Sequence, residues 1–381
     1  MNTLHLNRWD IFCRVIDNFG DIGVSWRLAR QLVSEHGVQV RLWVDQMASL
    51  HALCPQVHVD ALRQVVHGVE IFQTADESGF ARPADVVIEA FGCGLPQRYV
   101  AAMAARETRP LWIVLEYLSA EPWVSSHHGL PSPHPQLNLP RVFFFPGFTE
   151  GSGGVLREAD LLTRRDAFDA QAKRACWSRM GFDDVPRDAI AVSLFAYAHA
   201  PYQALLEACV KGVSPVVVAI PEGPLAARVR DDKRGFKDNR LRKGNLELRL
   251  VPFVPQANYD ELLWACDVNF VRGEDSFVRA QWAARPLVWH IYPQEANAHV
   301  AKLNAFLEIY TGDFSAPAAQ VVRGLWQAWN GMKGAPPVAD AWRAFSQELQ
   351  AQRQGLRCWQ ERLLRAGDVA GNLLKLCQKM I

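Results

Sequence analysis

The chain lacks a dominant charge, a long apolar run and any Cys-x-x-Cys pair. Its 41 basic and 40 acidic residues leave a formal net charge of +1, so no whole-protein field attracts nucleic acid or an anionic membrane. No apolar run approaches the roughly 20 residues of a membrane span, and the polar segment 1–10 lacks the apolar centre of a signal peptide. The eight cysteines are scattered, mostly within apolar segments, which is typical of reduced thiols. We therefore expect a cytoplasmic protein without a membrane or nucleic-acid partner.

Three nucleotide- and metal-binding signatures are also missing. The sequence contains no G-x-x-x-x-G-K-[ST], no G-x-G-x-x-G and no H-E-x-x-H. Their absence argues against a P-loop nucleotidase, a dinucleotide site with the usual glycine fingerprint and a zinc protease. No internal repeat or low-complexity tract is present either.

What the chain does contain is typical of a folded α/β protein. Of its 381 residues 49% are hydrophobic and 21% charged, and this length favours two domains. Near-continuous apolar runs alternate with helical patterns, which favours parallel strands covered on both faces. The strand candidates are 11–16, 38–44, 85–90, 110–115, 142–145, 189–195, 215–220, 246–253, 268–271 and 287–291. The helix candidates are 24–35, 47–53, 99–105, 201–211, 259–265, 277–284 and 295–308.

Composition changes divide the chain into domains. A glycine-rich stretch at 146–157, followed by charged residues as far as Arg165, predicts a boundary between domains 1–158 and 159–381. Segment 342–380 is predicted to form one or two long amphipathic helices, with a break near Gly367 and a return to the first domain as an option. The charged segment 231–243 is interpreted as a solvated loop, or alternatively as a basic surface for an acidic partner. We expect Trp26, Trp43, Trp112 and Trp289 in the core.

The most informative motif is Asp-Asn-Phe-Gly-Asp-Ile-Gly at 17–23, between an apolar run and an amphipathic helix. In an open α/β sheet, such a strand-to-helix turn borders the ligand crevice. Glycine there usually lets the backbone approach a phosphate, but Asp17 and Asp21 would repel an anion. The turn therefore favours a cationic or proton-bearing ligand. These two acids form a poor Mg²⁺ site because no further carboxylate clusters with them, so we expect no metal.

A second motif has the opposite character. Residues 271–281 read Val-Arg-Gly-Glu-Asp-Ser-Phe-Val-Arg-Ala-Gln, again after a strand. Asp275 or Ser276 is a good N-cap for the helix, and the first-turn amides with Arg272 can hold a diphosphate without metal. Glu274 would then lie beside a ligand's polar groups. The alternative role of Glu274 and Asp275 is simple helix capping.

Three further features lie at strand ends. Pro252-Phe-Val-Pro-Gln256 ends a strand and leaves backbone groups for a planar base. Phe195 and Tyr197 are candidates to stack on a base or ribose, with core packing as the alternative. His290 is a candidate ligand contact or a packed core histidine.

Taken together, five motifs resemble the EarP family, the bacterial protein-arginine rhamnosyltransferases that modify translation elongation factor P. The resemblance covers residues from about 10 to 300, with the motifs in the family's order. The motifs lie at 15–27, 115–121, 252–256, 272–281 and 289–294.

The resemblance implies a fold and a reaction. The fold would be α/β of the GT-B glycosyltransferase class, with two Rossmann-like lobes and a central cleft. The first lobe would take the acceptor, a single arginine of the factor's N-terminal domain, and the second the donor, dTDP-β-L-rhamnose. Transfer would invert the anomeric configuration and need neither cofactor nor metal.

The resemblance also implies site residues. Asp21 would be the general base, Asp17 its partner acid, and Glu274 a further catalytic residue that also binds the donor. The other donor-binding candidates are Asn18, Phe19, Gly20, Phe195, Tyr197, Gln256, Arg272, Asp275 and Ser276. Loops 116–121 and 125–135 are hypotheses for acceptor docking.

Alternatives remain open from the sequence. The same fold could serve a nucleotide-sugar glycosyltransferase with a small-molecule acceptor, such as a lipid-linked glycan, or an epimerase. A non-catalytic binding module on a degenerate scaffold is disfavoured because both acid-bearing loops are intact.

Overall fold

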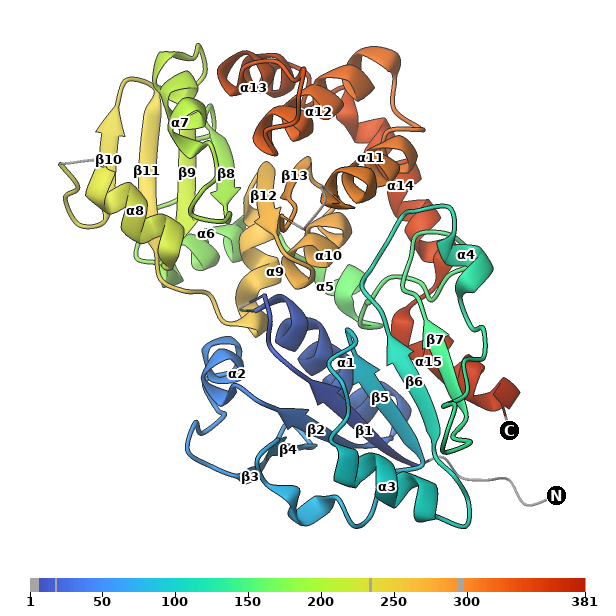
Figure 1. The fold of residues 1–381 in the computed structure, drawn as a ribbon. Coiled ribbons are helices and arrows are strands. Elements are labelled where there is room, and N and C mark those ends of the chain that lie inside the picture. The colour runs from blue at the N-terminus through green and yellow to red at the C-terminus, as the bar shows by residue number, and fades with distance from the viewer. Residues whose placement is uncertain (1–6, 18, 233–234, 294–297, 381) are drawn as a thin grey trace. The chain divides into compact units, whose positions relative to one another are not determined.

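The computed structural model describes residues 7–17, 19–232, 235–293 and 298–380. The chain forms two compact units, one made of Met1–Ala159 with Arg362–Ile381 and the other of Asp160–Glu361. Each unit contains a mostly parallel β-sheet with helices against it (Figure 1). In the described ranges, no helix combines the length and apolar character needed to span a membrane.

The sheet of the first unit has seven strands in the order β3-β4-β2-β1-β5-β6-β7. All pairs are parallel except β3 with β4. The strands are β1 (Arg8–Cys13), β2 (Gln39–Val44), β3 (Arg63–Val66), β4 (Val69–Gln73), β5 (Val86–Ala90), β6 (Leu111–Leu115) and β7 (Arg141–Phe144). The helices are α1 (Gly20–His36), α2 (Met47–Leu53), the 3-10 turn η1 (Glu77–Gly79), α3 (Gln97–Ala105), α4 (Val124–His127) and α15 (Val369–Met380).

The sheet of the second unit has six strands in the order β10-β11-β9-β8-β12-β13, and only β10 is antiparallel to its neighbour. The strands are β8 (Ile190–Leu194), β9 (Val216–Pro221), β10 (Arg240–Lys243), β11 (Leu246–Val251), β12 (Val268–Arg272) and β13 (Leu287–His290). The helices are α5 (Leu161–Asp166), α6 (Ala170–Arg179), α7 (Tyr202–Lys211), α8 (Pro224–Asp232), α9 (Gln256–Ala265), α10 (Asp275–Trp282), α11 (Ala298–Tyr310), α12 (Ala316–Trp329) and α13 (Val338–Gln347). Helix α14 (Gln352–Ala366) contains the boundary between the units.

The two sheets repeat one topology. β3-β4-β2-β1-β5-β6 of the first corresponds strand by strand to β10-β11-β9-β8-β12-β13 of the second, and β7 is an addition. In both sheets the edge strand is antiparallel and the others parallel. β1 is therefore equivalent to β8, and β5 to β12. In each sheet, ligand-binding loops are expected beyond the carboxyl ends of these central strands.

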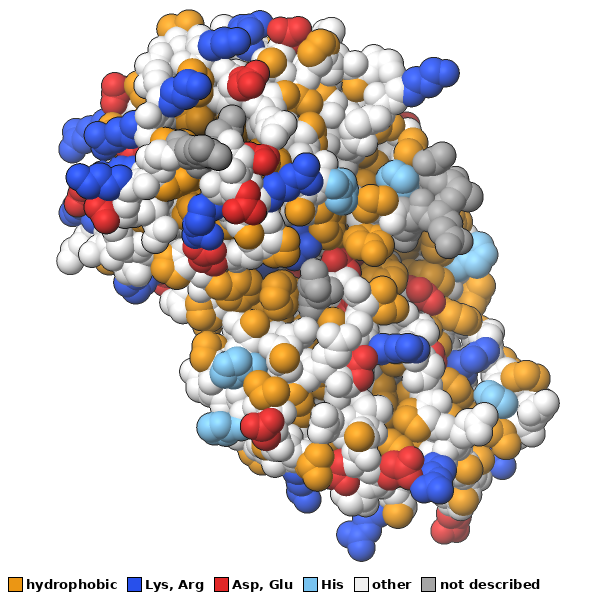
Figure 2. All heavy atoms as spheres, turned by 60° about the vertical axis from the view of Figure 1, so that its left-hand side comes forward, with side chains coloured by type: hydrophobic (Ala, Val, Ile, Leu, Met, Phe, Trp, Pro, Cys, Tyr) orange, Lys and Arg blue, Asp and Glu red, His pale blue; other side chains and the backbone are white. Residues whose placement is uncertain are grey.

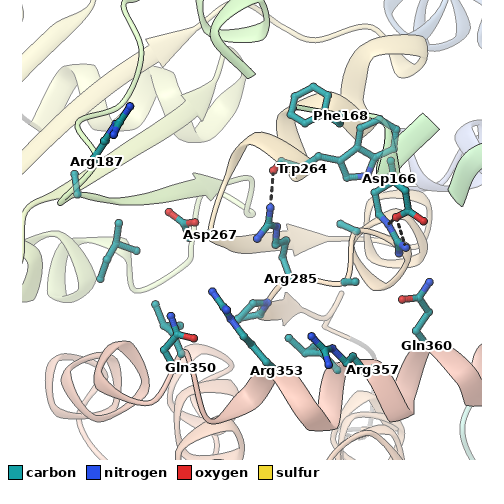
Figure 3. A pocket seen from close by; sticks show the side chains of 18 of the residues that line it. Asp166, Phe168, Arg187, Trp264, Asp267, Arg285, Gln350, Arg353, Arg357 and Gln360 are labelled. Atoms are coloured by element: carbon teal, nitrogen blue, oxygen red, sulfur yellow. Dashed lines mark hydrogen bonds and ion pairs between the residues drawn. The ribbon is translucent and has the colours of Figure 1, made fainter. Parts of the chain in front are cut away.

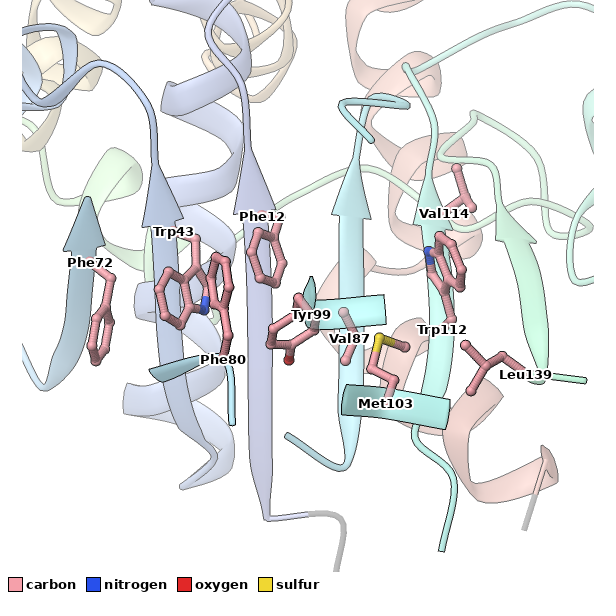
Figure 4. Close-up of a cluster of buried hydrophobic side chains, with 10 residues drawn as sticks. All are labelled: Phe12, Trp43, Phe72, Phe80, Val87, Tyr99, Met103, Trp112, Val114 and Leu139. Carbon is pink, nitrogen blue, oxygen red and sulfur yellow. The ribbon is translucent and has the colours of Figure 1, made fainter. Parts of the chain in front are cut away.

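An aromatic cluster forms the core on one face of the first sheet (Figure 4). The ring of Trp43 lies parallel to that of Phe12, with centroids 5.4 Å apart, and stacks on Phe72 at 4.4 Å. Next to this cluster the fully buried carboxylate of Asp10 accepts two hydrogen bonds of 2.5 Å from Arg41 and one from Tyr99. This pairing offsets the cost of burying the charge. On the surface shown in Figure 2, acidic and basic side chains are interspersed.

Most of the predicted elements are confirmed. Each of the ten strand candidates overlaps an observed strand, and the parallel pairing of the central strands is as expected. Trp26, Trp43, Trp112 and Trp289 are all buried. Every cysteine is free, and only Cys93 and Cys358 are partly exposed.

The first loop begins earlier than predicted. The strand expected at 11–16 ends at Cys13, because the next amides bond to side chains instead of the sheet. The Val15 amide donates to Asp45 at 3.0 Å, and the Ile16 amide donates to Asp21 at 2.8 Å. Helix α1 starts at Gly20 and not near Val24, so Asp21 lies in its first turn. The helix ends at His36, and the left-handed φ of 66° at Gly37 lets the following Val38 amide donate to the Leu32 carbonyl at 3.1 Å.

Three other predictions were wrong in detail. Segment 231–243 is not all loop, because β10 pairs with β11 and Glu247 bonds both Arg240 and Arg242. Strands β3 and β4 were missed. The tail forms three helices, α13, α14 and α15, although the predicted break at Gly367 is correct. Gly367 bonds Val155 through its carbonyl at 3.1 Å, and Asp368 accepts from Gln31 at 3.2 Å, which ties the start of α15 into the first unit.

Candidate active site

In the first unit, the turn between β1 and α1 places the acidic motif beyond the carboxyl end of a central strand. The Gly20 amide donates to the Asp17 carbonyl at 2.7 Å, and the Gly23 amide to the Phe19 carbonyl at 2.9 Å. These two bonds close the turn and start the helix. Asp17 and Phe19 are half-buried and Gly20 is buried. Asn18 was also predicted as a site residue, and it lies outside the described residues.

The Asp21 side chain folds back onto this turn. Only 1% of Asp21 is exposed, and its Oδ2 accepts hydrogen bonds from the amides of Ile16 at 2.8 Å and Asp17 at 3.0 Å. A carboxylate oxygen has two lone pairs, so these bonds occupy Oδ2. Oδ1 accepts one further bond, from the Tyr117 hydroxyl at 3.0 Å. Three donors therefore fix the orientation of the carboxylate, and Oδ1 keeps one lone pair.

Tyr117 was not among the predicted site residues. It follows β6, and its ring stacks on Phe91 with centroids 4.5 Å apart and planes 19° apart. Phe91 follows β5 and has a left-handed φ of 57°. The stack thus joins residues that follow the neighbouring strands β5 and β6, and it orients the tyrosine. The sequence did contain a signal, since Tyr117 lies within the motif at 115–121, but no spacing rule connects it to Asp21.

In the second unit, Arg272 ends β12 and lies between two aromatic rings. Its guanidinium carbon is 4.8 Å from the ring centroid of Phe195 and 4.6 Å from that of Tyr197. Both rings follow β8, which is next to β12, and the Phe195 amide donates to the Phe270 carbonyl at 3.0 Å. Only 8% of Arg272 is exposed, and within the described ranges it forms no ion pair with a carboxylate. The aromatic faces stabilise this cation without neutralising it.

The turn after Arg272 brings the remaining motif residues to the start of α10. Gly273 has a left-handed φ of 61°, and its carbonyl accepts a hydrogen bond of 2.9 Å from the Trp289 indole. Ser276 Oγ accepts from the Arg272 amide at 3.1 Å and donates to the Arg272 carbonyl. Glu274, Asp275 and Ser276 are all buried.

The predicted capping of this helix was wrong. Glu274 occupies the N-cap position, and no side chain accepts a capping bond there. Ser276 instead bonds the Arg272 backbone, and the Asp275 carboxylate accepts from the Gln256 side-chain amide at 3.0 Å. The helix begins at Asp275 and not at Phe277. Its first-turn amides therefore lack a side-chain cap, an arrangement that suits an anion.

His290 ends β13 beside the same aromatic group. It is 4% exposed, and its Nδ1 accepts a 3.3 Å hydrogen bond from the Tyr197 amide. Burial, assisted by the nearby His199 and Arg272, lowers the pKa of His290 to about 3. Because an amide can only donate, the neutral ring carries its proton on Nε2. His290 thus packs against Tyr197 and holds its backbone.

The predicted residues form two groups, one in each unit. The first group is Asp17, Phe19, Gly20 and Asp21, at the β1–α1 turn. The second is Phe195, Tyr197, Gln256, Arg272, Glu274, Asp275 and Ser276, at the carboxyl ends of β8 and β12 and the starts of α9 and α10. Across the described part of the chain, no cluster of three or more His, Cys, Asp or Glu side chains could hold a metal ion.

Two Rossmann-like sheets with such loops at the carboxyl ends of their strands are the architecture of the GT-B glycosyltransferase fold. A glycosyltransferase structure from Rickettsia africae shares this fold, with a TM-score of 0.54 at 9% identity over 97% of each chain.

The particular family follows from closer matches. The family model described as Elongation-Factor P (EF-P) rhamnosyltransferase EarP matches residues 9–378, and the chain belongs to this family. A protein-arginine rhamnosyltransferase of Pseudomonas putida is 48% identical over 96% of this chain and 97% of its own length. One of Neisseria meningitidis serogroup B is 38% identical over 94% of each. A solved structure concerning EarP-mediated arginine glycosylation of translation elongation factor EF-P has a TM-score of 0.68 and 35% identity, over 98% of this chain and 99% of that one. The protein is accordingly a protein-arginine rhamnosyltransferase.

Proposed function

We propose that this enzyme transfers L-rhamnose from dTDP-β-L-rhamnose to a single arginine of translation elongation factor P by one inverting displacement. The observation that carries the proposal is the Asp21 carboxylate, which three donors hold at a turn that also bears Asp17. A rhamnosyltransferase acting on arginine needs such a group, because the substrate guanidinium is a cation that must lose a proton as it reacts.

Donor binding is assigned to the second unit. Arg272 and the uncapped first turn of α10 would hold the diphosphate, and Phe195 and Tyr197 keep the guanidinium in place. This arrangement supplies the positive charge that a divalent metal supplies in other transferases, so we propose that no metal takes part. Glu274 would contact the sugar hydroxyls, and Gln256 with Asp275 orients the starts of α9 and α10.

Acceptor binding is assigned to the first unit. The half-buried Asp17 would pair with the incoming guanidinium and align one nitrogen with the anomeric carbon, which turns an encounter into an oriented reaction. Phe19 and Gly20 shape the turn that holds this carboxylate, and loops 116–121 and 125–135 are proposed to contact the acceptor protein.

The chemical step then balances as follows. A guanidinium nitrogen forms a bond to the anomeric carbon as the bond from that carbon to the diphosphate oxygen breaks. The nitrogen's proton passes to Asp21 Oδ1, which keeps a free lone pair, and the electron pair of the broken bond leaves with dTDP. Proton removal during bond formation, and not before it, suits a carboxylate base. Arg272 stabilises the charge that develops on the leaving group, and the β-linked donor gives an α-linked product.

Intact mass of elongation factor P after incubation with the enzyme and dTDP-rhamnose tests the proposal. We expect a gain of one deoxyhexose, located on one arginine by peptide fragmentation, and an α-linkage by NMR. The control reactions use the Asp21→Asn enzyme and an acceptor with lysine at that arginine. Absence of the gain with the wild-type enzyme, together with donor hydrolysis or epimerisation, would favour a small-molecule substrate instead.

A further inference from the structure

A cavity of about 660 Å³ lies in the second unit, away from the residues that are proposed to bind the donor. It is lined by the start of β8, the residues before β12 and β13, and α14 with its preceding turn (Figure 3). Asp267 lines it directly before β12, whereas Arg272 ends the same strand. At about 3.3 Å per residue, these two ends are roughly 13 Å or more apart. The cavity therefore lies at the amino-terminal ends of the strands, whereas the proposed donor-binding group lies at their carboxyl ends.

Positive charge dominates this cavity. Five arginines line it, against three aspartates, and the balance is a surplus of two positive charges. The arginines are Arg165, Arg187, Arg285, Arg353 and Arg357, and the aspartates are Asp166, Asp188 and Asp267. The side-chain amides of Gln350 and Gln360 add neutral donors.

Two of the arginines have structural roles. Arg165 donates to the Trp282 carbonyl at the end of α10 at 2.9 Å and pairs with Asp166 at 2.7 Å. Arg285 donates to the Trp264 carbonyl near the end of α9 at 3.5 Å. Cations at helix carboxyl ends stabilise the helix dipole. Helix capping thus accounts for these two side chains.

Helix capping does not account for the other three. Arg187, Arg353 and Arg357 are exposed, and among the described residues their guanidinium groups have no hydrogen bond or ion pair. Arg353 and Arg357 are four residues apart on α14, where like charges lie on one face and repel each other. Figure 3 shows both side chains on the cavity wall, with Arg285 beside them. A bound anion would remove this repulsion.

From this arrangement we propose that the arginine cavity binds a small phosphate-bearing anion, in addition to the proposed donor at Arg272. Arginine forks match phosphate oxygens, and several forks that line one cavity favour a multivalent anion. The volume fits a small molecule. Asp267 lines the cavity and directly precedes β12, and Arg272 is the last residue of that strand. One strand therefore connects the cavity with the proposed donor site.

Calorimetric titration of the full chain with inorganic pyrophosphate at low ionic strength tests this site. The wild-type protein should also bind pyrophosphate at the proposed donor site, so the comparison is made in the Arg272→Ala background. There we expect one remaining binding event, which Arg353→Gln/Arg357→Gln weakens about tenfold or more because charge-assisted hydrogen bonds are lost. The matched control is Arg174→Gln/Lys333→Gln, which removes two exposed positive charges of the same unit outside the cavity.

Each other outcome overturns the proposal. These outcomes are no pyrophosphate binding, equal binding by the Arg353→Gln/Arg357→Gln variant, and an equal loss in the control variant, which would show only non-specific charge attraction. Loss in Arg272→Ala alone would place the anion at the donor site. Thermal unfolding of each variant confirms that the fold is intact, which is expected because the substituted side chains are exposed.

Discussion

The turn at Asp17–Asp21 and the turn at Arg272–Ser276 are built in the same way but present different groups. The charged side chains of the first are both acidic, whereas the second carries a buried arginine beside two acids. Each joins a central parallel strand to a helix, and in each a first-turn side chain folds back onto backbone amides. In the first turn that side chain is the Asp21 carboxylate, so a negative charge remains at the turn. In the second it is the neutral Ser276 hydroxyl, and the turn contains the Arg272 cation together with the carboxylates of Glu274 and Asp275.

This difference supports the proposed division of the two substrates between the units. The two sheets have equivalent strand orders, yet the acids follow β1 whereas the arginine is the last residue of β12, the equivalent of β5. At β8, the equivalent of β1, the chain carries Phe195 and Tyr197 instead of acids, and these rings hold Arg272. The group that each turn presents thus depends on the residue that returns to the backbone and on the side chains of the neighbouring strand.

Replacing the returning carboxylate should have the largest effect. The Asp21→Asn side chain keeps an oxygen that accepts from the Ile16 and Asp17 amides, and its NH₂ group can donate to Tyr117, so the turn should persist. We expect turnover to fall roughly 10²- to 10⁴-fold, as for loss of a general base. Quantitative mass spectrometry of rhamnosylated acceptor measures the rate.

The control is Asp17→Asn, which changes the more exposed acid of the same turn. We expect it to raise the acceptor KM more than it lowers kcat, since Asp17 is assigned to binding. Donor affinity should be unchanged in both variants. Near-normal kcat in Asp21→Asn would show that another group takes the proton.

Removal of the Arg272 cation should have the next largest effect. In Arg272→Ala the donor diphosphate loses charge-assisted hydrogen bonds worth about 2–3 kcal/mol, so the donor Kd should rise roughly 30- to 160-fold. Arg272→Lys should give an intermediate loss, because it keeps the charge but not the planar group between Phe195 and Tyr197. Calorimetry with dTDP measures both, and an unchanged Kd in Arg272→Ala would contradict the diphosphate role.

The sequence predicted the positions of these turns better than their internal bonding. Near-continuous apolar runs between helical patterns identified the central strands, since buried parallel strands are apolar throughout. The same rule missed β10, whose Arg240 and Arg242 pair with Glu247, a partner that only the folded hairpin reveals. Capping rules pointed to Asp275 or Ser276, but both side chains have tertiary partners, Gln256 and the Arg272 backbone. Tyr117 was missed because its contact with Asp21 joins residues far apart in the sequence.

The stability of the protein should also depend on pH through His290. Burial lowers the pKa of His290 to about 3 in the folded protein, from 6.5 in the unfolded chain. Below pH 6.5 the unfolded chain therefore binds a proton that the folded protein does not, and stability falls as pH decreases. Between pH 7 and pH 5 this amounts to about 2 kcal/mol.

Urea denaturation of wild type and His290→Gln at both pH values measures this contribution. We expect the variant to be less stable at pH 7 but to lose about 2 kcal/mol less between the two pH values. An equal loss in both proteins would show that other groups cause the pH dependence.

The smallest effect should come from Tyr117, whose hydroxyl donates to Asp21 in the first turn. In the second turn, Ser276 Oγ bonds the backbone of Arg272. Tyr117→Phe keeps the stack on Phe91 but removes the hydroxyl that orients Asp21 Oδ1. We expect kcat to fall about tenfold, equivalent to one lost hydrogen bond of about 1.4 kcal/mol, with donor Kd and acceptor KM unchanged. Phe91→Leu is the matched variant, because it loosens the ring and keeps the hydroxyl, and it should lower kcat less. If Tyr117→Phe instead changed acceptor KM alone, the hydroxyl would contact the acceptor and would not position the base.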